Sequence, residues 1–178
     1  LIGEDAGIAI STGDRNTAVG YQSLKTTSTG QYNTAIGYQA LEANTGSGNT
    51  AVGDQALEAN IGGANNTAVG DDAGVAVTTG SNNTFIGVAA GDGTDDGGNN
   101  TAVGKSALTS NCGDNNTAVG LEALRDTTGS INTAIGKNSG NAITSGSKNT
   151  IIGSYTGNQD SLDIRTSSEN VIISDGDG

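Results

Sequence analysis

The chain has 178 residues, with 30 Gly, no His, Pro, Met or Trp, and 7 basic against 19 acidic residues. A net charge of −12 argues against nucleic acid as a partner, because too few Lys and Arg are present to neutralise a phosphate backbone. Without His, acid–base catalysis at neutral pH lacks its usual residue. We therefore expect no enzyme, no catalytic residues, no cofactor and no metal. No stretch is long and apolar enough to cross a bilayer, so we expect no membrane insertion.

The first residues already belong to a repeat. Leu1-Ile2-Gly3 matches the end of a five-residue phrase, Asn-Thr-(Ala/Phe/Ile)-(Val/Ile)-Gly, and we read the chain as a piece of a longer array. The complete phrase occurs nine times, at residues 16–20, 33–37, 49–53, 66–70, 83–87, 100–104, 116–120, 132–136 and 149–153. Because successive phrases lie 16 or 17 residues apart, the chain repeats one small unit. Such a period is typical of a solenoid.

Each unit reads as a short strand, a corner, a second extended piece and a Gly-rich turn. Val and Ile favour strands, and Gly in the turns can adopt positive φ. The sequence thus predicts an all-β fold, a parallel β-solenoid (β-roll or β-helix) of about ten coils, in residues 1–157. Residues 158–178 break the period and are expected to form a capping or neck segment that leads to a further domain. Neither the handedness nor the arrangement of chains in this segment, side by side or intertwined, follows from the sequence.

The Asn that opens each phrase forms a column if the coils stack, and we expect an amide ladder in which each side chain donates to the next. Strand alternation puts Thr and Val or Ile on one face and Ala and Gly on the other. If the small residues fill the interior, the Val/Ile column is exposed and needs another surface to cover it. If Val and Ile fill the interior instead, the Ala/Gly side permits close approach of a neighbour. Either arrangement favours packing against another chain.

Two kinds of unit differ four positions after the phrase's Gly. Some carry Leu there, and others carry Gly: the Leu positions are Leu24, Leu41, Leu57, Leu108 and Leu124, and the Gly positions are Gly7, Gly74, Gly91, Gly140 and Gly157. The Gly units often carry apolar residues shortly afterward, which we expect to fill the same space; these are Ile8, Ile10, Val75, Val77 and Ile143.

The phrases, and the longer form Asn33-Thr34-Ala35-Ile36-Gly37-Tyr38-Gln39-Ala40-Leu41, resemble repeat regions of bacteriophage tail fibres. They are also similar to the YadA-like head β-roll of trimeric autotransporter adhesins, whose units are shorter. The tail from Ser161 to Gly178 is similar to segments that close such arrays in phage structural proteins. The resemblance implies a homotrimeric, extracellular tail fibre of a virion. Its partners would be other virion tail proteins and a bacterial surface receptor, with a glycan as one candidate. The alternative is an adhesin head on the bacterial outer surface.

Several residues suggest more specific functional interpretations. The acidic residues Asp71, Asp72, Asp92, Asp95, Asp96, Asp175 and Asp177 have the oxygens that Ca²⁺ prefers, although solvated turn carboxylates are the simpler reading. Tyr21 and Tyr38 share one phase in adjacent coils and could form an aromatic platform for a sugar, or simply pack together.

Four Asn-Asn-Thr triplets, which begin at Asn65, Asn82, Asn99 and Asn115, match the glycosylation pattern only because the repeat produces them. A Thr column could also order water in an ice-binding solenoid, although each coil supplies one Thr at this phase. Cys112 has no partner Cys.

Overall fold

The computed structural model describes residues 2–159 and 161–175. Twelve strands are found in this part of the chain. They are β1 (Thr17–Val19), β2 (Thr34–Ile36), β3 (Thr50–Val52), β4 (Thr67–Val69), β5 (Thr84–Ile86), β6 (Thr101–Val103), β7 (Thr117–Val119), β8 (Thr133–Ile135), β9 (Thr150–Ile152), β10 (Asn158–Gln159), β11 (Leu162–Asp163) and β12 (Val171–Ile173). The first nine coincide with the centres of the nine phrases.

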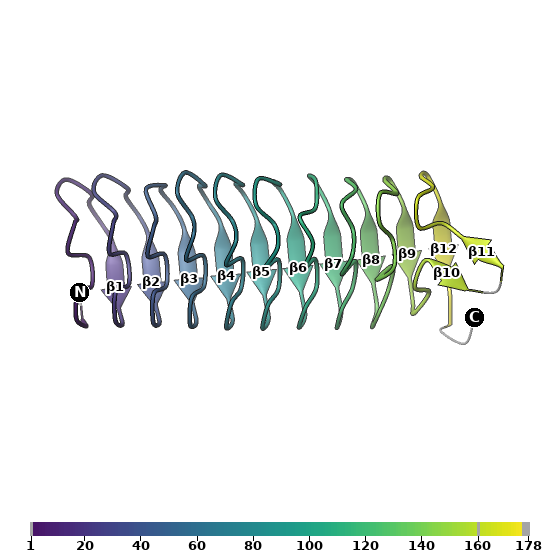
Figure 1. Ribbon diagram of the computed structural model, residues 1–178, viewed down its shortest axis with the longest axis horizontal. Helices are drawn as coiled ribbons and strands as arrows, with labels where there is room; N and C mark the ends of the chain where they lie inside the picture. The colour runs from purple at the N-terminus through teal and green to yellow at the C-terminus, as the bar shows by residue number, and fades with distance from the viewer. Residues whose placement is uncertain (1, 160, 176–178) are drawn as a thin grey trace.

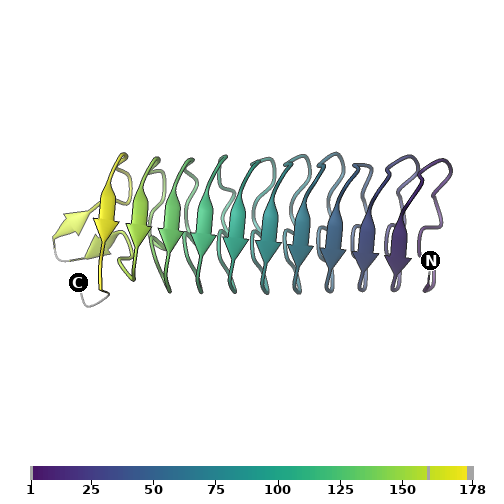
Figure 2. The ribbon, with the colours of Figure 1, turned by 180° about the vertical axis from the view of Figure 1, so that it is seen from behind.

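Ten strands form one parallel sheet in the order β1 to β9 followed by β12. Thr pairs with Thr at each step from β1 to β9, so the register follows the repeat even where the interval shortens to 16 residues. The strands stand in a straight row and keep nearly the same direction from end to end (Figures 1 and 2). The predicted parallel β-solenoid is confirmed.

The period breaks after Gly157, where β10 and β11 pair as an antiparallel hairpin beside the last coils (Figure 1). The chain then returns to the sheet, because β12 pairs with β9 in parallel. The Asn column continues as well, since the Asn170 backbone N–H donates to Asn149 Oδ1 at 3.0 Å. The segment after 157 therefore contains both a hairpin and one further strand of the solenoid.

The interior of the solenoid is narrow and filled by small side chains and Leu. The middle residue of each strand is fully buried, and it is Ala in seven of the nine coils. The small residue three positions after the phrase's Gly and the Leu one position later complete the core, as Ala40 and Leu41 do in one coil. Of the two arrangements left open by the sequence, the structure has the one in which small residues fill the interior and Val and Ile face outward.

The Asn column shows the expected amide-to-amide bonds at only two steps among the described residues, from Asn116 Nδ2 to Asn100 Oδ1 at 3.3 Å and from Asn170 Nδ2 to Asn149 Oδ1 at 2.8 Å. Each side-chain carbonyl accepts the backbone N–H of the Asn in the next coil, at 2.8 to 3.0 Å from Asn16 through to Asn170. The side-chain amide usually donates to the carbonyl of a turn Gly in the next coil, as Asn66 does to Gly80 at 2.8 Å. The buried Asn therefore fastens the backbone of one coil to that of its neighbour, which explains why the buried position keeps a polar residue.

The Gly that ends each phrase is required by close stacking. At Gly53, φ is +146°, and a Cβ would overlap the carbonyl oxygen of Gly70 in the next coil. The same overlap with the equivalent Gly recurs from Gly20 to Gly136. No larger residue fits, because the backbones of successive coils approach each other directly at this corner.

The difference between Leu and Gly units is explained by the strand residues. Leu at the variable position takes a left-handed φ of 49° to 55°, and its side chain fills the core. In two neighbouring Gly units the space is occupied by Phe85, since a Cβ on Gly74 or Gly91 would lie 2.9 or 2.5 Å from its ring. Ile151 does the same beside Gly140, where a Cβ would lie 3.1 Å from its Cδ1. Val77 and Ile143 are also buried as expected, whereas Ile8 is exposed.

Candidate functional site

The most regular surface of the molecule is the outer face of β1 to β9, which we call the strand face. It consists of the first and third residues of each strand, and these are always Thr and then Val or Ile. Ile36, Val69, Ile86, Ile135 and Ile152 keep 38–43% of their surface exposed, and the other aliphatic residues of the column are half-buried. An exposed aliphatic column of this length is unusual for a surface that meets only water.

The Thr column beside it has no internal structural task that involves its hydroxyls. Among the described residues, none of the nine strand Thr hydroxyls forms a hydrogen bond within the protein. Other Thr residues do form such bonds, as Thr27 Oγ1 does to Asn44 O at 2.7 Å. The strand face therefore presents methyl groups in two columns and free hydroxyls in one, with no charge over nine strands.

Two columns of mostly exposed residues border the strand face. The leading flank is the residue before each Asn: Arg15, Tyr32, Gly48, Asn65, Asn82, Asn99, Asn115, Ile131 and Lys148. The trailing flank is the residue after each phrase's Gly: Tyr21, Tyr38, Asp54, Asp71, Val88, Lys105, Leu121, Lys137 and Ser154. Residue type varies along both flanks, in contrast to the constant strand face between them.

The exposed aromatic residues gather at the N-terminal end of the flanks. The rings of Tyr21 and Tyr38 stack with centroids 5.4 Å apart and planes 11° apart. The Arg15 guanidinium lies over the Tyr32 ring, 5.0 Å from its centroid. Tyr21 and Tyr38 thus cover one face of each other instead of lying edge to edge, and this geometry matches the packing interpretation better than a flat platform for a sugar.

The acidic residues do not converge on a metal site. Among the described residues, no group of three or more His, Cys, Asp or Glu side chains is placed to hold a metal ion. Burial raises the pKa of Asp92, and the nearby Asp72 raises it further. Asp95 Oδ1 accepts a hydrogen bond from Thr78 Oγ1. Asp177 lies outside the described residues. The described turn carboxylates therefore do not gather into a metal site, although Asp72 and Asp92 lie close enough to interact.

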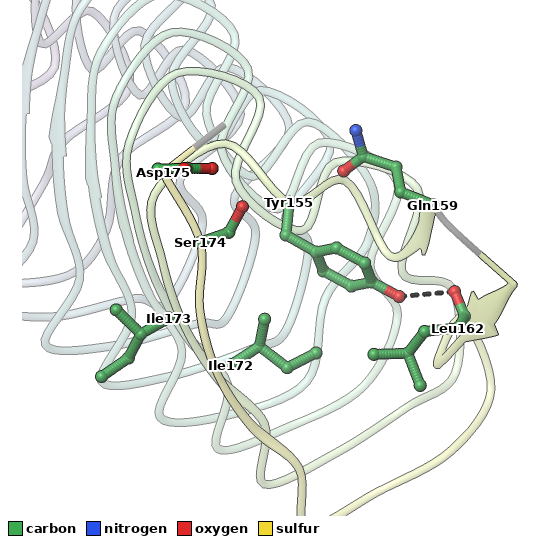
Figure 3. Close-up of a pocket in the computed structure, with 7 residues that line it drawn as sticks. All are labelled: Tyr155, Gln159, Leu162, Ile172, Ile173, Ser174 and Asp175. Carbon is green, nitrogen blue, oxygen red and sulfur yellow. Dashed lines mark hydrogen bonds between the residues drawn. The ribbon is translucent and has the colours of Figure 1, made fainter. Parts of the chain in front are cut away.

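A cavity of about 630 Å³ lies between the C-terminal hairpin and β12 (Figure 3). The Tyr155 hydroxyl donates to the Leu162 carbonyl at 2.7 Å and so links the last coil to β11. Figure 3 shows the side chain of Tyr155 between β12 and this hairpin. The cavity is lined by Tyr155, Gln159, Leu162, Ile172, Ile173, Ser174 and Asp175.

Cys112 is buried and contacts Thr94 in the neighbouring coil, with 3.4 Å between Sγ and Oγ1. Burial raises the pKa of its thiol. The side chain is therefore an inert part of the core and does not act as a surface nucleophile.

The sequence predicted the columns but did not determine which of them is exposed. The alternation of Thr, Ala and Val predicted two faces, and only the packing of Leu and Phe85 inside the coil decides that the Val/Ile face is outside. The flanks were not recognised as one surface, although the four exposed Asn residues at 65, 82, 99 and 115 could have indicated it.

Comparison of the chain with protein-family models, with curated proteins and with solved structures found no match. In the part of the chain that the structure describes, no helix is long and apolar enough to cross a membrane.

Proposed function

We propose that the chain is a segment of an extracellular homotrimeric fibre, a virion tail fibre that presents host-receptor binding to a bacterial surface. The observation that carries the proposal is the continuous ladder of ten parallel strands in a straight row. At about 4.8 Å per strand the ladder is roughly 48 Å long, so each further unit of about 17 residues lengthens the rod without a change of fold.

A spacer in a fibre must resist bending and proteolysis. In this chain every coil is bonded to the next through the sheet, the buried Asn column and the stacked corner glycines. We assign the segment no catalytic role, since the sequence has no His for acid–base catalysis at neutral pH. The trimer, the virion location and the bacterial receptor come from the resemblance of the repeat phrase to tail fibre repeats.

An adhesin head on the bacterial outer surface is the second candidate, and the same rod supports it. The two differ in the domain that the array joins: a virion-attachment domain indicates a fibre, and a membrane anchor after a coiled coil indicates an adhesin. Sequencing the gene beyond this segment separates them.

The proposal is tested by sedimentation of the soluble segment together with negative-stain images. A particle of three chain masses, seen as a short rod, supports the trimeric fibre. A chain that stays monomeric at high concentration contradicts it.

A further inference from the structure

The surface between the two flanks has the properties of an interface between copies of this chain. Burial explains why the strand Ala, the Asn and the corner Gly recur in nearly every coil. It does not explain why nine strands keep an outward Thr without a hydrogen bond and an outward Val or Ile, while the flanks beside them vary. Strand propensity favours β-branched residues at both positions, but it does not fix Thr first and an aliphatic residue third in every coil.

Charge restricts where one copy can approach another. Each chain carries a net charge of −12. Residues 26–104 contain no Lys or Arg and eight acidic residues, which are Glu42, Asp54, Glu58, Asp71, Asp72, Asp92, Asp95 and Asp96. Two acidic rods repel each other unless they meet where charge is absent. The strand face meets that condition over the length of β1 to β9.

The area of the strand face shows how much of the surrounding surface an interface between copies must include. Nine strands at about 4.8 Å, each three residues or roughly 10 Å wide, give a strip of about 430 Å². A standard interface buries about 800 Å² on each partner, so the strip alone is too small. With the two flanks included, the strip becomes the apolar centre of an interface and the flanks become its polar rim.

The flanks also distinguish between two ways of pairing. If copies are related by an axis parallel to the rod, the trailing flank of one copy faces the leading flank of the next within the same coil. No two like charges then meet in any of the nine coils, because at most one residue of each facing pair carries a charge. The facing pairs are Tyr21 with Arg15, Tyr38 with Tyr32, Asp54 with Gly48, Asp71 with Asn65, Val88 with Asn82, Lys105 with Asn99, Leu121 with Asn115, Lys137 with Ile131, and Ser154 with Lys148. If the copies run in opposite directions, the leading flanks face each other and Arg15 meets Lys148.

We infer that copies of this chain associate through the strand face, parallel and in register, with the trailing flank of each copy against the leading flank of the next. This inference rests on the proposed homotrimer and adds the surface, the direction and the register of its contacts. The partner is a second copy of the same chain, and other occupants of the face are outcomes of the test below.

The first test places positive charge in the centre of the face. The variant Val69→Lys with Val103→Lys should sediment as a folded monomer, because Lys residues from different copies would meet in a desolvated strip. Lys also lowers the net negative charge, so dissociation cannot result from greater overall repulsion. Ile61→Lys is the matched control, since Ile61 is exposed in a turn away from the face, and it should keep the mass of the wild type. Retention of the assembly in the double variant, or its loss in the control, would overturn the inference.

The second test uses one substitution at two places in the same column. Asn65 and Asn99 are both exposed, both have a left-handed φ of 57° and 59°, and neither side chain forms a hydrogen bond within the described residues. Asn65→Asp should weaken association, since it faces Asp71 of the next copy. Asn99→Asp should strengthen association, since it faces Lys105. Equal effects, or the opposite order, would contradict the parallel in-register arrangement.

The outcomes separate this inference from the proposed function. If the wild type is trimeric but the face variants remain trimeric, the fibre stands and the interface lies elsewhere. A monomeric wild type contradicts both, and thermal hysteresis in that monomer would show that the face binds ice instead of a second copy.

Discussion

Phe85 and the two glycines beside it should behave as one packing unit. Phe85 is fully buried, and the loss of a buried Phe side chain costs about 3–5 kcal/mol. Phe85→Ala should therefore lower the unfolding temperature by roughly 6–20 °C, at 2–4 °C per kcal/mol for a chain of this size. The variant also removes the ring that fills the core beside both Gly74 and Gly91.

A substitution at Gly91 tests whether the Phe85 ring fills the space beside this glycine. Gly91→Leu alone should be destabilising by about 1–3 kcal/mol or more, because the new Cβ would lie 2.5 Å from the Phe85 ring. In the Phe85→Ala background the same Leu should be nearly neutral. There it gains about 1.5–3 kcal/mol from burial and loses about 1–2 kcal/mol to the left-handed φ that Leu accepts in five other coils.

The assay is a double-mutant cycle measured by denaturant unfolding of the four proteins. Contacting residues give coupling energies of about 0.5–3 kcal/mol, and we expect about 2 kcal/mol here. Additive effects, within about 0.5 kcal/mol, would refute the view that Phe85 replaces the Leu missing from its coils.

Four further predictions concern the connections between coils and the buried thiol. Asn66→Ala should cost about 3 kcal/mol, because it leaves the buried Asn83 N–H and Gly80 carbonyl unpaired, and faster amide exchange at Asn83 would show the loss directly. Gly53→Ala should prevent folding or lower the unfolding temperature sharply, whereas Gly62→Ala, where a Cβ meets nothing within 4 Å, should change it little; similar melting curves would contradict the stacking argument. Burial raises the pKa of the Cys112 thiol, so the native chain at pH 8 should react with a thiol reagent far more slowly than the unfolded chain. By the same raised pKa, the thiol ionises first in the unfolded state, and stability should fall above about pH 8.5 more in the wild type than in Cys112→Ser.

The period of the sequence predicted the solenoid, its strands and their register because each coil repeats the same pairing. The Asn column was predicted as well, but its bonding was wrong at most steps, because a side chain between two coils mainly bonds to backbone groups, as the bond from the Asn83 N–H to Asn66 Oδ1 shows. Phe85 and Ile151 were not identified as core fillers, since their role depends on glycines in two different coils. The hairpin at 158–163 was not foreseen either, because a break in period gives no pattern to extrapolate.

Distances between spin labels would show directly whether copies associate parallel and in register through the strand face. Thr29→Cys, between β1 and β2, and Ser145→Cys, between β8 and β9, are at exposed turn positions off the strand face, and each would be labelled in a Cys112→Ser background. Parallel association in register predicts the same distance between copies at both positions, since equivalent coils lie at one level along the rod. Copies that ran in opposite directions would place the Thr29 labels more than about 30 Å apart along the rod, given some 38 Å between β1 and β9 at about 4.8 Å per strand, and that result would contradict parallel association.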